Sequence, residues 1–228
     1  VIDFETTGLS PTQGDRATEI AVVLVQGGRV VDRFQSLMNA GVRISSFIES
    51  FTGISNAMVA AAPPAAQVMA GAARFVGSAP LVAHNAGFDR RFWQAELARV
   101  GPDATAAHNP FACTMLLSRR LYPQAPGHKL GTLAAFHALP SAGRAHRALA
   151  DAEVAAALLG RIQADLCSRF GVAAASHSLL MAVQACQRHA LGAAVQRHLA
   201  AGSAAGSGVT PAPIIPPHTL QERASWAC

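Results

Sequence analysis

The chain opens with VIDFETTGL (residues 1–9), a stretch in which two carboxylates alternate with apolar side chains. Successive side chains of a β-strand point to opposite faces, so Asp3 and Glu5 share one face of the strand predicted over residues 1–5. Two carboxylates this close resist ionising together unless a positive charge lies between them, and a divalent metal ion supplies one. The stretch predicts either a metal site or, as the alternative, the solvated polar face of an edge strand.

The strand pattern continues beyond this opening. Residues 19–25 are a run of mainly β-branched and aliphatic residues, the turn Gln26-Gly27-Gly28 follows, and residues 30–37 alternate. These segments predict a meander of three strands. Thr6-Thr7-Gly8-Leu9 turns off the first strand. This turn offers hydroxyl groups and a glycine at which a substrate could approach the backbone closely.

Helical periodicity dominates the rest of the chain. Residues 55–76 are Ala-rich and helical in pattern around a break at Pro63-Pro64, and residues 80–83 form a short apolar strand. Further helices are predicted over residues 89–100, 114–121, 129–137 and 148–167. Strands first and helices interleaved later indicate an α/β domain over residues 1–170.

Two segments follow this domain. Over residues 174–200 the apolar side chains fall on one helical face, which predicts a helical extension of one or two helices within residues 171–200. From residue 201 to 217 the composition collapses to Ala, Gly, Ser and Pro, which cannot bury enough apolar area to offset the entropy of ordering. We therefore expect residues 201–228 to be a flexible tail.

Composition excludes several classes of protein. Hydrophobic residues make up 51% of the 228 and charged residues 14%, which excludes a mostly disordered chain. No run of about 18 apolar residues is present, so no membrane span is expected. The net charge of +5, from 18 Lys plus Arg against 13 Asp plus Glu, suits a polyanionic partner.

The four cysteines form no CxxC pair, which argues against a zinc ribbon or a disulfide scaffold and favours a cytoplasmic protein with reduced thiols. No signal peptide is recognisable at the N-terminus. Because the chain begins without methionine and directly in a strand pattern, we expect its natural start to lie upstream.

Two further carboxylates stand in polar motifs. Asp89 ends AHNAGFD (residues 83–89) directly after a predicted strand, where it is either a site residue or a helix cap. Asp151 ends HRALAD (residues 146–151) on a predicted helix among alanines, an expensive place for a carboxylate without a partner. His146 begins that motif; taken alone, a histidine is more often structural than catalytic.

Together, DFETTGL (3–9), HNAGFD (84–89) and HRALAD (146–151) resemble the three motifs of the DEDDh, or DnaQ-like, 3′–5′ exonucleases. This family includes the proofreading ε subunit of bacterial DNA polymerase III, RNase T and oligoribonuclease. FTGIS (51–55) and HKLGTLA (128–134) fall in the family's order, and His146 puts the chain in the His branch. The resemblance covers residues 1–170 and implies a ribonuclease H-like fold, a mixed central sheet flanked by helices, here with a C-terminal helical extension.

The resemblance also implies a set of functional residues. Two divalent cations, Mg²⁺ or Mn²⁺, would be held by Asp3, Glu5, Asp89 and Asp151, with Asp3 bridging both ions, and hard oxygen ligands of this kind suit either metal. His146 would act as the general base that takes a proton from the attacking water. The expected contacts to the terminal nucleotide are Thr6, Thr7, Gly8, Leu9, Thr52, Ile54, His84 and Phe88. For Phe88, core packing is the alternative, and His84 could instead shape the turn before Asp89.

The implied activity is hydrolysis of phosphodiester bonds from the 3′ end of nucleic acid, with single-stranded DNA favoured, releasing 5′-mononucleotides by a two-metal mechanism in proofreading or DNA repair. One alternative is an exoribonuclease of the RNase T or oligoribonuclease kind, and another is an adaptor that binds nucleic acid or a polymerase. A DNA polymerase subunit is the possible protein partner that the resemblance implies. Because no clamp-binding peptide follows Phe170, a stand-alone or accessory exonuclease is favoured over the replicative subunit. Four arginines beside the motifs would attract the phosphate backbone, unless they are solvated surface residues: Arg90, Arg91, Arg144 and Arg147.

Overall fold

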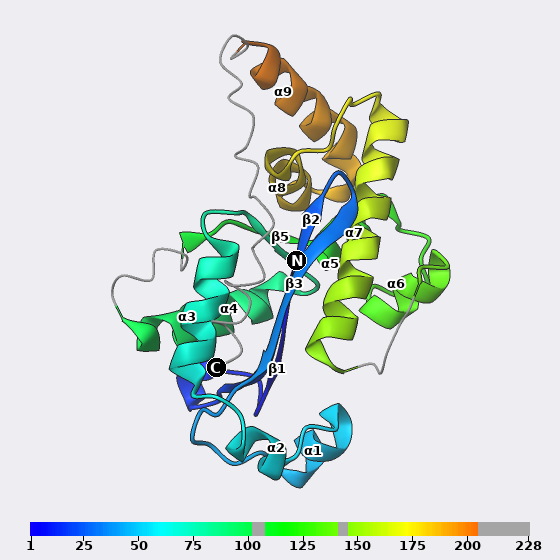
Figure 1. Cartoon of the computed structure of the whole chain (residues 1–228). Coiled ribbons are helices and arrows are strands. Elements are labelled where there is room, and N and C mark those ends of the chain that lie inside the picture. Colours follow the sequence, from blue (N-terminus) through cyan, green and yellow to red (C-terminus); the bar gives the residue numbers. More distant parts are fainter. Residues whose placement is uncertain (102–107, 141–145, 205–228) are drawn as a thin grey trace.

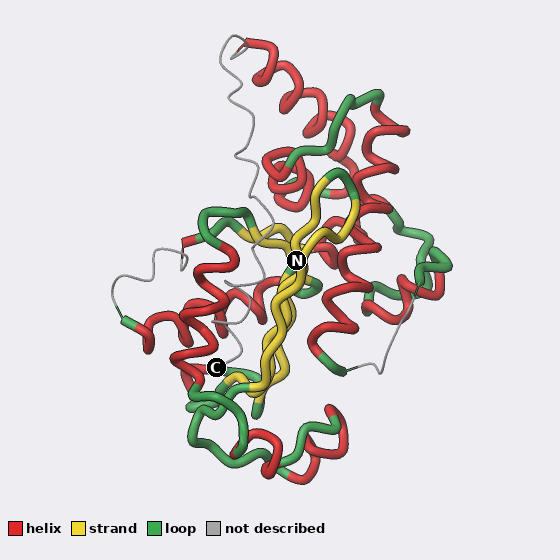
Figure 2. Tube along the Cα trace, viewed as in Figure 1, coloured by secondary structure: helices red, strands yellow, loops and turns green. Residues whose placement is uncertain are grey.

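The computed structural model describes residues 1–101, 108–140 and 146–204. Within these residues the strands run through the middle of the molecule and helices lie on both sides of them (Figures 1 and 2). The predicted tail from residue 205 onward and Arg144 lie outside the described residues.

The strands form two hydrogen-bonded sheets, one of three antiparallel strands and one of two parallel strands, which lie next to each other. Strand β1 (Ile2–Thr6) pairs antiparallel with β2 (Ala17–Gln26), and β2 pairs antiparallel with β3 (Arg29–Leu37), as the meander predicted. Strand β4 (Leu81–Ala83) pairs in parallel with β5 (Phe111–Cys113) and lies next to β1. The ribonuclease H-like α/β class that the sequence predicted is confirmed.

Helices of the described residues connect and cover these strands. Helices α1 and α7 end at glycines with a left-handed backbone, Gly53 and Gly171, where a side chain would strain the backbone. Pro63 and Pro64 separate α2 from α3, as expected from the sequence. The helices are α1 (Ser46–Thr52), α2 (Asn56–Ala60), α3 (Ala65–Val76), α4 (Ala86–Val100), α5 (Thr114–Leu121), α6 (Leu130–Phe136), α7 (Ala148–Phe170), α8 (His177–Ala185) and α9 (Leu191–Ala204), with short 3-10 turns η1 (Pro11–Gln13) and η3 (Arg188–Ala190).

The two faces of β1 bury different partners, and this alternation positions the acidic residues. Ile2 and Phe4 point into a cluster with residues of α3 and α4, such as Phe75 and Trp93. Asp3 and Glu5, on the opposite face, therefore point toward the side that α7 covers. Asp3 and Glu5 are two residues apart, and the pleat of β1 places their side chains on the same face, as the sequence predicted.

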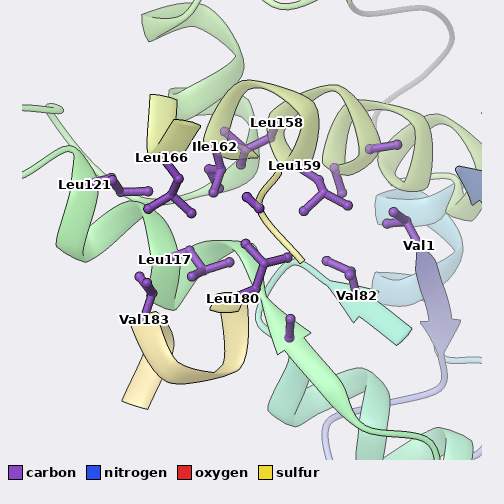
Figure 3. Close-up of a cluster of buried hydrophobic side chains, with 14 of the residues drawn as sticks. Val1, Val82, Leu117, Leu121, Leu158, Leu159, Ile162, Leu166, Leu180 and Val183 are labelled. Atoms are coloured by element: carbon purple, nitrogen blue, oxygen red, sulfur yellow. The ribbon is translucent and has the colours of Figure 1, made fainter. Parts of the chain in front are cut away.

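The face of the sheet covered by α7 carries the larger of the two main apolar clusters, and α8 closes it. Leu158 and Ile162 from α7 meet Leu117 from α5, and Leu180 and Val183 from α8 (Figure 3). The C-terminal helices thus share a core with the α/β domain, which stabilises both by removing apolar area from water.

Helix α8 also covers the open edge of β5. The Gln184 side chain accepts a hydrogen bond from the backbone N–H of Cys113 (2.6 Å) and donates one to the carbonyl of Phe111 (3.1 Å). A side-chain amide here takes the place of a neighbouring strand, so these edge groups of β5 are satisfied.

Some elements differ from the sequence-based expectations. Neither α1 nor β5 was predicted, and α4 begins at Ala86, three residues before the expected start. Helix α9 continues to Ala204, so the first residues of the predicted tail are helical. In the part of the chain that the structure describes, no helix combines the length and apolar character needed to cross a membrane.

Candidate active site

An open cleft of about 530 Å³ brings the three sequence motifs together. Its walls come from β1 and the turn that follows it, from α1, from the start of α4 and from the start of α7. It is lined by Asp3, Phe4, Glu5, Thr6, Thr7, Gly8, Leu9, Ser45, Phe47, Ile48, Phe51, Thr52, His84, Phe88, Asp89, His146 and Asp151.

Carboxylates occupy one part of this cleft. Ligand oxygens of Asp3, Glu5 and Asp151 all lie within 4.8 Å of one another. Asp89 lines the same cleft from the first turn of α4 and is almost fully buried, with hydrogen bonds from its own N–H and from that of Phe4. Three of the four carboxylates can therefore contact one ion directly, and the fourth lies beside them.

Burial and the proximity of like charges dominate the electrostatics of these groups. Burial, together with the charges of Asp89, Glu5 and Asp151, raises the pKa of Asp3 well above its ordinary value. Burial raises the pKa of Glu5 to about 8, with neighbouring carboxylates adding to the effect, and burial raises the pKa of Asp89 to about 8. The pKa of Asp151 is also raised by burial. Such a cluster favours any divalent cation that enters it.

His146 lies at the mouth of the cleft, immediately before α7. Its backbone has φ 62°, a left-handed conformation, and its N–H donates to Oδ2 of Asp151 at 3.1 Å. Its ring lies over the ring of Phe51 with 3.9 Å between centroids. The imidazole thus lies beside the carboxylates, at the place where a substrate would enter.

The turn after β1 is held by a small polar network. The Thr6 hydroxyl donates to the carbonyl of Gly8 at 2.6 Å, and the Ser10 N–H donates to the Asp15 carboxylate at 2.9 Å. A Cβ on Gly8 would overlap that carboxylate, so a side chain here would displace Asp15 from its hydrogen bonds with Thr7 and Ser10. Leu9 projects from the turn and is 78% exposed, the most exposed of the large apolar side chains in the described residues.

His84 has both ring nitrogens engaged. Its Nε2 lies 2.9 Å from the carbonyl of His128, which can only accept, so Nε2 carries the proton and Nδ1 accepts from the Thr114 hydroxyl at 2.9 Å. Burial lowers the pKa of His84 to about 4, which keeps the ring neutral. His84 therefore lines the cleft and also ties β4 to the start of α6. Phe88 lines the cleft as well and packs against Phe92, 4.9 Å between centroids.

The FTGIS segment contributes only in part. Thr52 lines the cleft, but its hydroxyl donates to the carbonyl of Ile48 and accepts from the N–H of Ile54. Ile54 is completely buried with Ile44 and Val59 and is not among the cleft residues. Ile54 was expected to contact the nucleotide, but its side chain fills the small core under α1 and α2 and does not line the cleft.

Helix α1 supplies residues that the sequence reasoning missed. Phe47 is 72% exposed and Phe51 46% exposed, and their rings stack with 6.0 Å between centroids and 9° between planes. Both line the cleft. The signal was present in the sequence as two phenylalanines four residues apart, a spacing that places both on one side of a helix.

The arginines beside the motifs divide into two groups. Arg90 and Arg91 are exposed near the start of α4, next to Asp89. Arg147 instead forms a two-pronged ion pair with the buried Glu19, through Nε at 3.0 Å and Nη2 at 2.8 Å. Burial alone would raise the pKa of Glu19, but hydrogen bonds from Arg147, Ala148 and Gln35 outweigh it and hold that pKa below its ordinary value.

The fold and the cleft define the class: a ribonuclease H-like α/β domain that gathers carboxylates in an open, nucleotide-sized cleft. The chain belongs to the RNase T family of exonucleases, since the sequence model of that family, described as Exonuclease, matches residues 1–159.

Known relatives agree with this membership. The chain is 39% identical over 162 residues to the DNA polymerase III PolC-type of Oceanobacillus iheyensis, covering 71% of this chain and 11% of that protein. It is 39% identical over 157 residues to the 3′–5′ exonuclease DinG of Bacillus subtilis, covering 68% and 16% respectively. The chain thus spans only a small part of these relatives.

Among solved structures, Exonuclease X in complex with 5′ overhanging duplex DNA is similar over nearly its whole length. Its sequence is 32% identical, the TM-score is 0.60, and the match covers 78% of this chain and 96% of that one.

Proposed function

We propose that the chain is a metal-dependent 3′–5′ exonuclease that removes 5′-mononucleotides from the 3′ end of single-stranded DNA. The observation that carries the proposal is the meeting of Asp3, Glu5 and Asp151 within 4.8 Å in a cleft that also holds Asp89 and His146. Family membership supports the reaction class, and the similarity to DinG of Bacillus subtilis, a 3′–5′ exonuclease, supports the direction.

The donor set fits divalent cations. Carboxylate oxygens are the ligands that Mg²⁺ and Mn²⁺ prefer, and the raised pKa values of these groups reflect a repulsion that a cation would relieve. Asp3, Glu5 and Asp151 would hold one ion, and Asp89 together with Asp3 a second. When bound, two such ions would supply Lewis acidity toward the phosphate oxygens and a more acidic water.

His146 would move the proton in this reaction. Its imidazole lies at the mouth of the cleft beside Asp151, within reach of a water approaching a bound phosphate. It would accept a proton from the attacking water and release it to solvent afterwards. Its left-handed backbone directs the ring into the cleft rather than along α7.

The walls of the cleft would bind the terminal nucleotide. The turn from Thr6 to Leu9 offers backbone groups and one exposed apolar side chain, and α1 offers two stacked rings. Phe88, His84 and Thr52 line the remaining wall. A base between Leu9 and the α1 rings would leave its 3′-terminal phosphodiester facing the carboxylates.

DNA is the substrate we favour. Exonuclease X was solved with duplex DNA carrying a 5′ overhang, and the PolC-type relative is a DNA polymerase. We propose a role in proofreading or DNA repair in the cytoplasm, as a stand-alone or accessory exonuclease for which a DNA polymerase subunit is the candidate protein partner. The exposed Arg90 and Arg91 would attract the phosphate backbone, so binding should weaken with salt.

The deciding experiment follows degradation of matched 5′-labelled single-stranded DNA and RNA in Mg²⁺, Mn²⁺ or EDTA. We expect stepwise shortening from the 3′ end that needs metal, runs faster on DNA, and is abolished in Asp3→Asn. His146→Ala should reduce kcat by roughly 10²-fold or more while leaving KM nearly unchanged.

Other outcomes would replace the proposal. Faster trimming of RNA would favour the exoribonuclease alternative, and retained nucleic-acid binding without hydrolysis would favour an adaptor. A mutant with His146→Ala that turns over normally at saturating metal would remove the general-base role.

A further inference from the structure

Glu19 is a fifth carboxylate next to the four carboxylates of the cleft, Asp3, Glu5, Asp89 and Asp151, which we call the acidic cluster. The proposed mechanism gives Glu19 no role. It lies on β2 directly opposite Glu5 in the strand register and is 1% exposed. Its charge adds to the repulsion felt by Asp3 and Glu5. A buried carboxylate in this position needs a reason to be there, because desolvation of an ionised group is costly.

All the acceptor capacity of Glu19 is already used. Oε1 accepts from Arg147 Nη2 (2.8 Å) and from Gln35 Nε2 (2.8 Å), and Oε2 accepts from Arg147 Nε (3.0 Å) and from the backbone N–H of Ala148 (3.1 Å). A carboxylate has about four lone-pair sites, so no oxygen of Glu19 is left to bind a cation. Glu19 is therefore set apart from the four cluster carboxylates.

These bonds fix the first residues of α7. Arg147 is the N-cap residue of that helix, and its own side chain caps no backbone group there. Glu19 supplies the missing acceptor from β2, since it binds the N–H of Ala148 at the helix start. His146 directly precedes this point, and Asp151 follows it by about one turn.

We propose that Glu19 and Arg147 form a positioning pair that locks the start of α7 onto the sheet and thereby sets Asp151 and His146 against Asp3 and Glu5. The pair rests on the proposed nuclease function, but neither member touches metal or substrate. Arg147 on this account is not a phosphate ligand, although its place beside His146 made that the expectation from sequence.

The molecule contains a matched pair elsewhere. Glu96, also 1% exposed, accepts from Arg16 Nε (2.8 Å) and Nη2 (2.9 Å) and from the backbone N–H of Ala17 (3.2 Å). Both pairs therefore join a buried glutamate to an Arg-Ala dipeptide in the same way. Breaking either pair should destabilise the fold similarly. The Glu19 pair is bonded at the start of the helix that carries Asp151, whereas Glu96 lies seven residues after Asp89 on α4.

The test compares Glu19→Gln, Arg147→Lys and Glu96→Gln with the wild-type chain. For each we would measure the Kd for Mn²⁺ by calorimetry without nucleic acid, the Tm in EDTA, and kcat and KM on single-stranded DNA at several salt concentrations. We expect Glu19→Gln and Arg147→Lys to weaken Mn²⁺ binding and to lower kcat by roughly tenfold or more, with KM unchanged. Glu96→Gln should lower the Tm by a similar amount to the other two variants but keep the wild-type Kd for Mn²⁺.

Two results would overturn the positioning role. If Arg147→Lys raises KM and flattens the salt dependence while Mn²⁺ affinity is unchanged, Arg147 contacts phosphate instead. If Glu19→Gln and Arg147→Lys lower the Tm but leave the Kd for Mn²⁺ and kcat unchanged, as Glu96→Gln is expected to do, the pair is only structural. Failure of the wild-type chain itself to bind Mn²⁺ and trim DNA would instead refute the proposed function, so the two failures are distinguishable.

Discussion

Glu5 is held in a place where its ionised form is unfavourable. Burial and neighbouring carboxylates raise its pKa to about 8, so the folded protein binds this proton more tightly than the unfolded chain does. The stability linked to Glu5 is therefore fully present below its ordinary pKa and is lost as the pH rises through about 8.

We predict that Glu5→Gln stabilises the metal-free protein, and more so at pH 8 than at pH 6. One pKa unit corresponds to about 1.4 kcal/mol, so the advantage over wild type should grow by roughly 2 kcal/mol between these values. Urea unfolding in EDTA at both pH values measures it. In saturating Mn²⁺ the order should reverse, because the variant lacks one of the proposed metal ligands.

Glu153→Gln is the control for this effect. Glu153 lies two residues after Asp151 on α7 but forms a surface ion pair with Arg33, half of whose side chain is exposed. Its replacement should change stability little and equally at both pH values. An advantage of Glu5→Gln that does not grow with pH would contradict the repulsion account.

Gly8 offers a second residue-scale prediction. Replacing it with alanine would push the new methyl group into the Asp15 carboxylate and displace the turn that we propose binds the terminal nucleotide. We expect Gly8→Ala to lower stability by about 1–3 kcal/mol and to raise KM for DNA. Thermal unfolding and steady-state kinetics check both.

Gly160→Ala provides the matched comparison. Gly160 lies inside α7 with no atom near the position of a new Cβ, so alanine there should stabilise the helix by up to about 1 kcal/mol. If both glycine variants behaved alike, the Asp15 contact would not be the reason for Gly8.

At the scale of single residues, most members of the candidate site could be predicted from the sequence. The shared face of Asp3 and Glu5 follows from strand alternation alone, and Asp89 and Asp151 came from motif resemblance rather than from periodicity. Glu19 could not be found in this way, because three of its four hydrogen bonds come from Arg147 and Ala148, about 130 positions later in the chain.

Among the elements, α1 gives the cleft its aromatic wall. Phe47 and Phe51 stack on each other and line the same cleft as the carboxylates. Flat exposed rings of this kind bind nucleobases by stacking, worth about 1–3 kcal/mol per base.

We predict that Phe47→Ala raises KM for single-stranded DNA by at least about fivefold and leaves stability within about 0.5 kcal/mol of wild type. The ring is 72% exposed, so its removal exposes little core. Val31→Ala, at a 43% exposed apolar residue on β3, should change neither quantity. An unchanged KM in Phe47→Ala would show that α1 does not contact the bound DNA.

Prediction of elements failed where the local pattern was short or mixed. Strand β5 has three residues, too few for periodicity to register, and it exists because it pairs with β4 and is covered by α8. Helix α1 contains two phenylalanines, an isoleucine and a threonine, residues that favour strands as much as helices. Its Ser45 cap, which accepts from the N–H of Ile48, was the available signal.

For the molecule as a whole, the C-terminal helices extend beyond the part that matches the exonuclease family. That match ends at residue 159, within α7, yet α8 completes the apolar core beneath α7 and covers the edge of β5. The extension is therefore part of one folded unit with the α/β domain.

We predict that Gln184→Ala lowers stability by about 1–3 kcal/mol, because the N–H of Cys113 and the carbonyl of Phe111 lose their partner. Chemical unfolding measures the loss, and light scattering should report more self-association through the uncovered strand edge. Gln187→Ala, at an exposed glutamine just after α8, is the control and should change neither. Equal behaviour of the two would mean that the edge is covered in another way.

The crowding of like charges on β1 also bears on how such a protein can be improved. Any selection for heat resistance alone, applied without metal, would reward neutral replacements of Asp3 or Glu5, since these remove repulsion. The survivors would be robust and inert. A search for a sturdier working enzyme should instead leave the first strand untouched and look to positions such as Gly160, far along the chain.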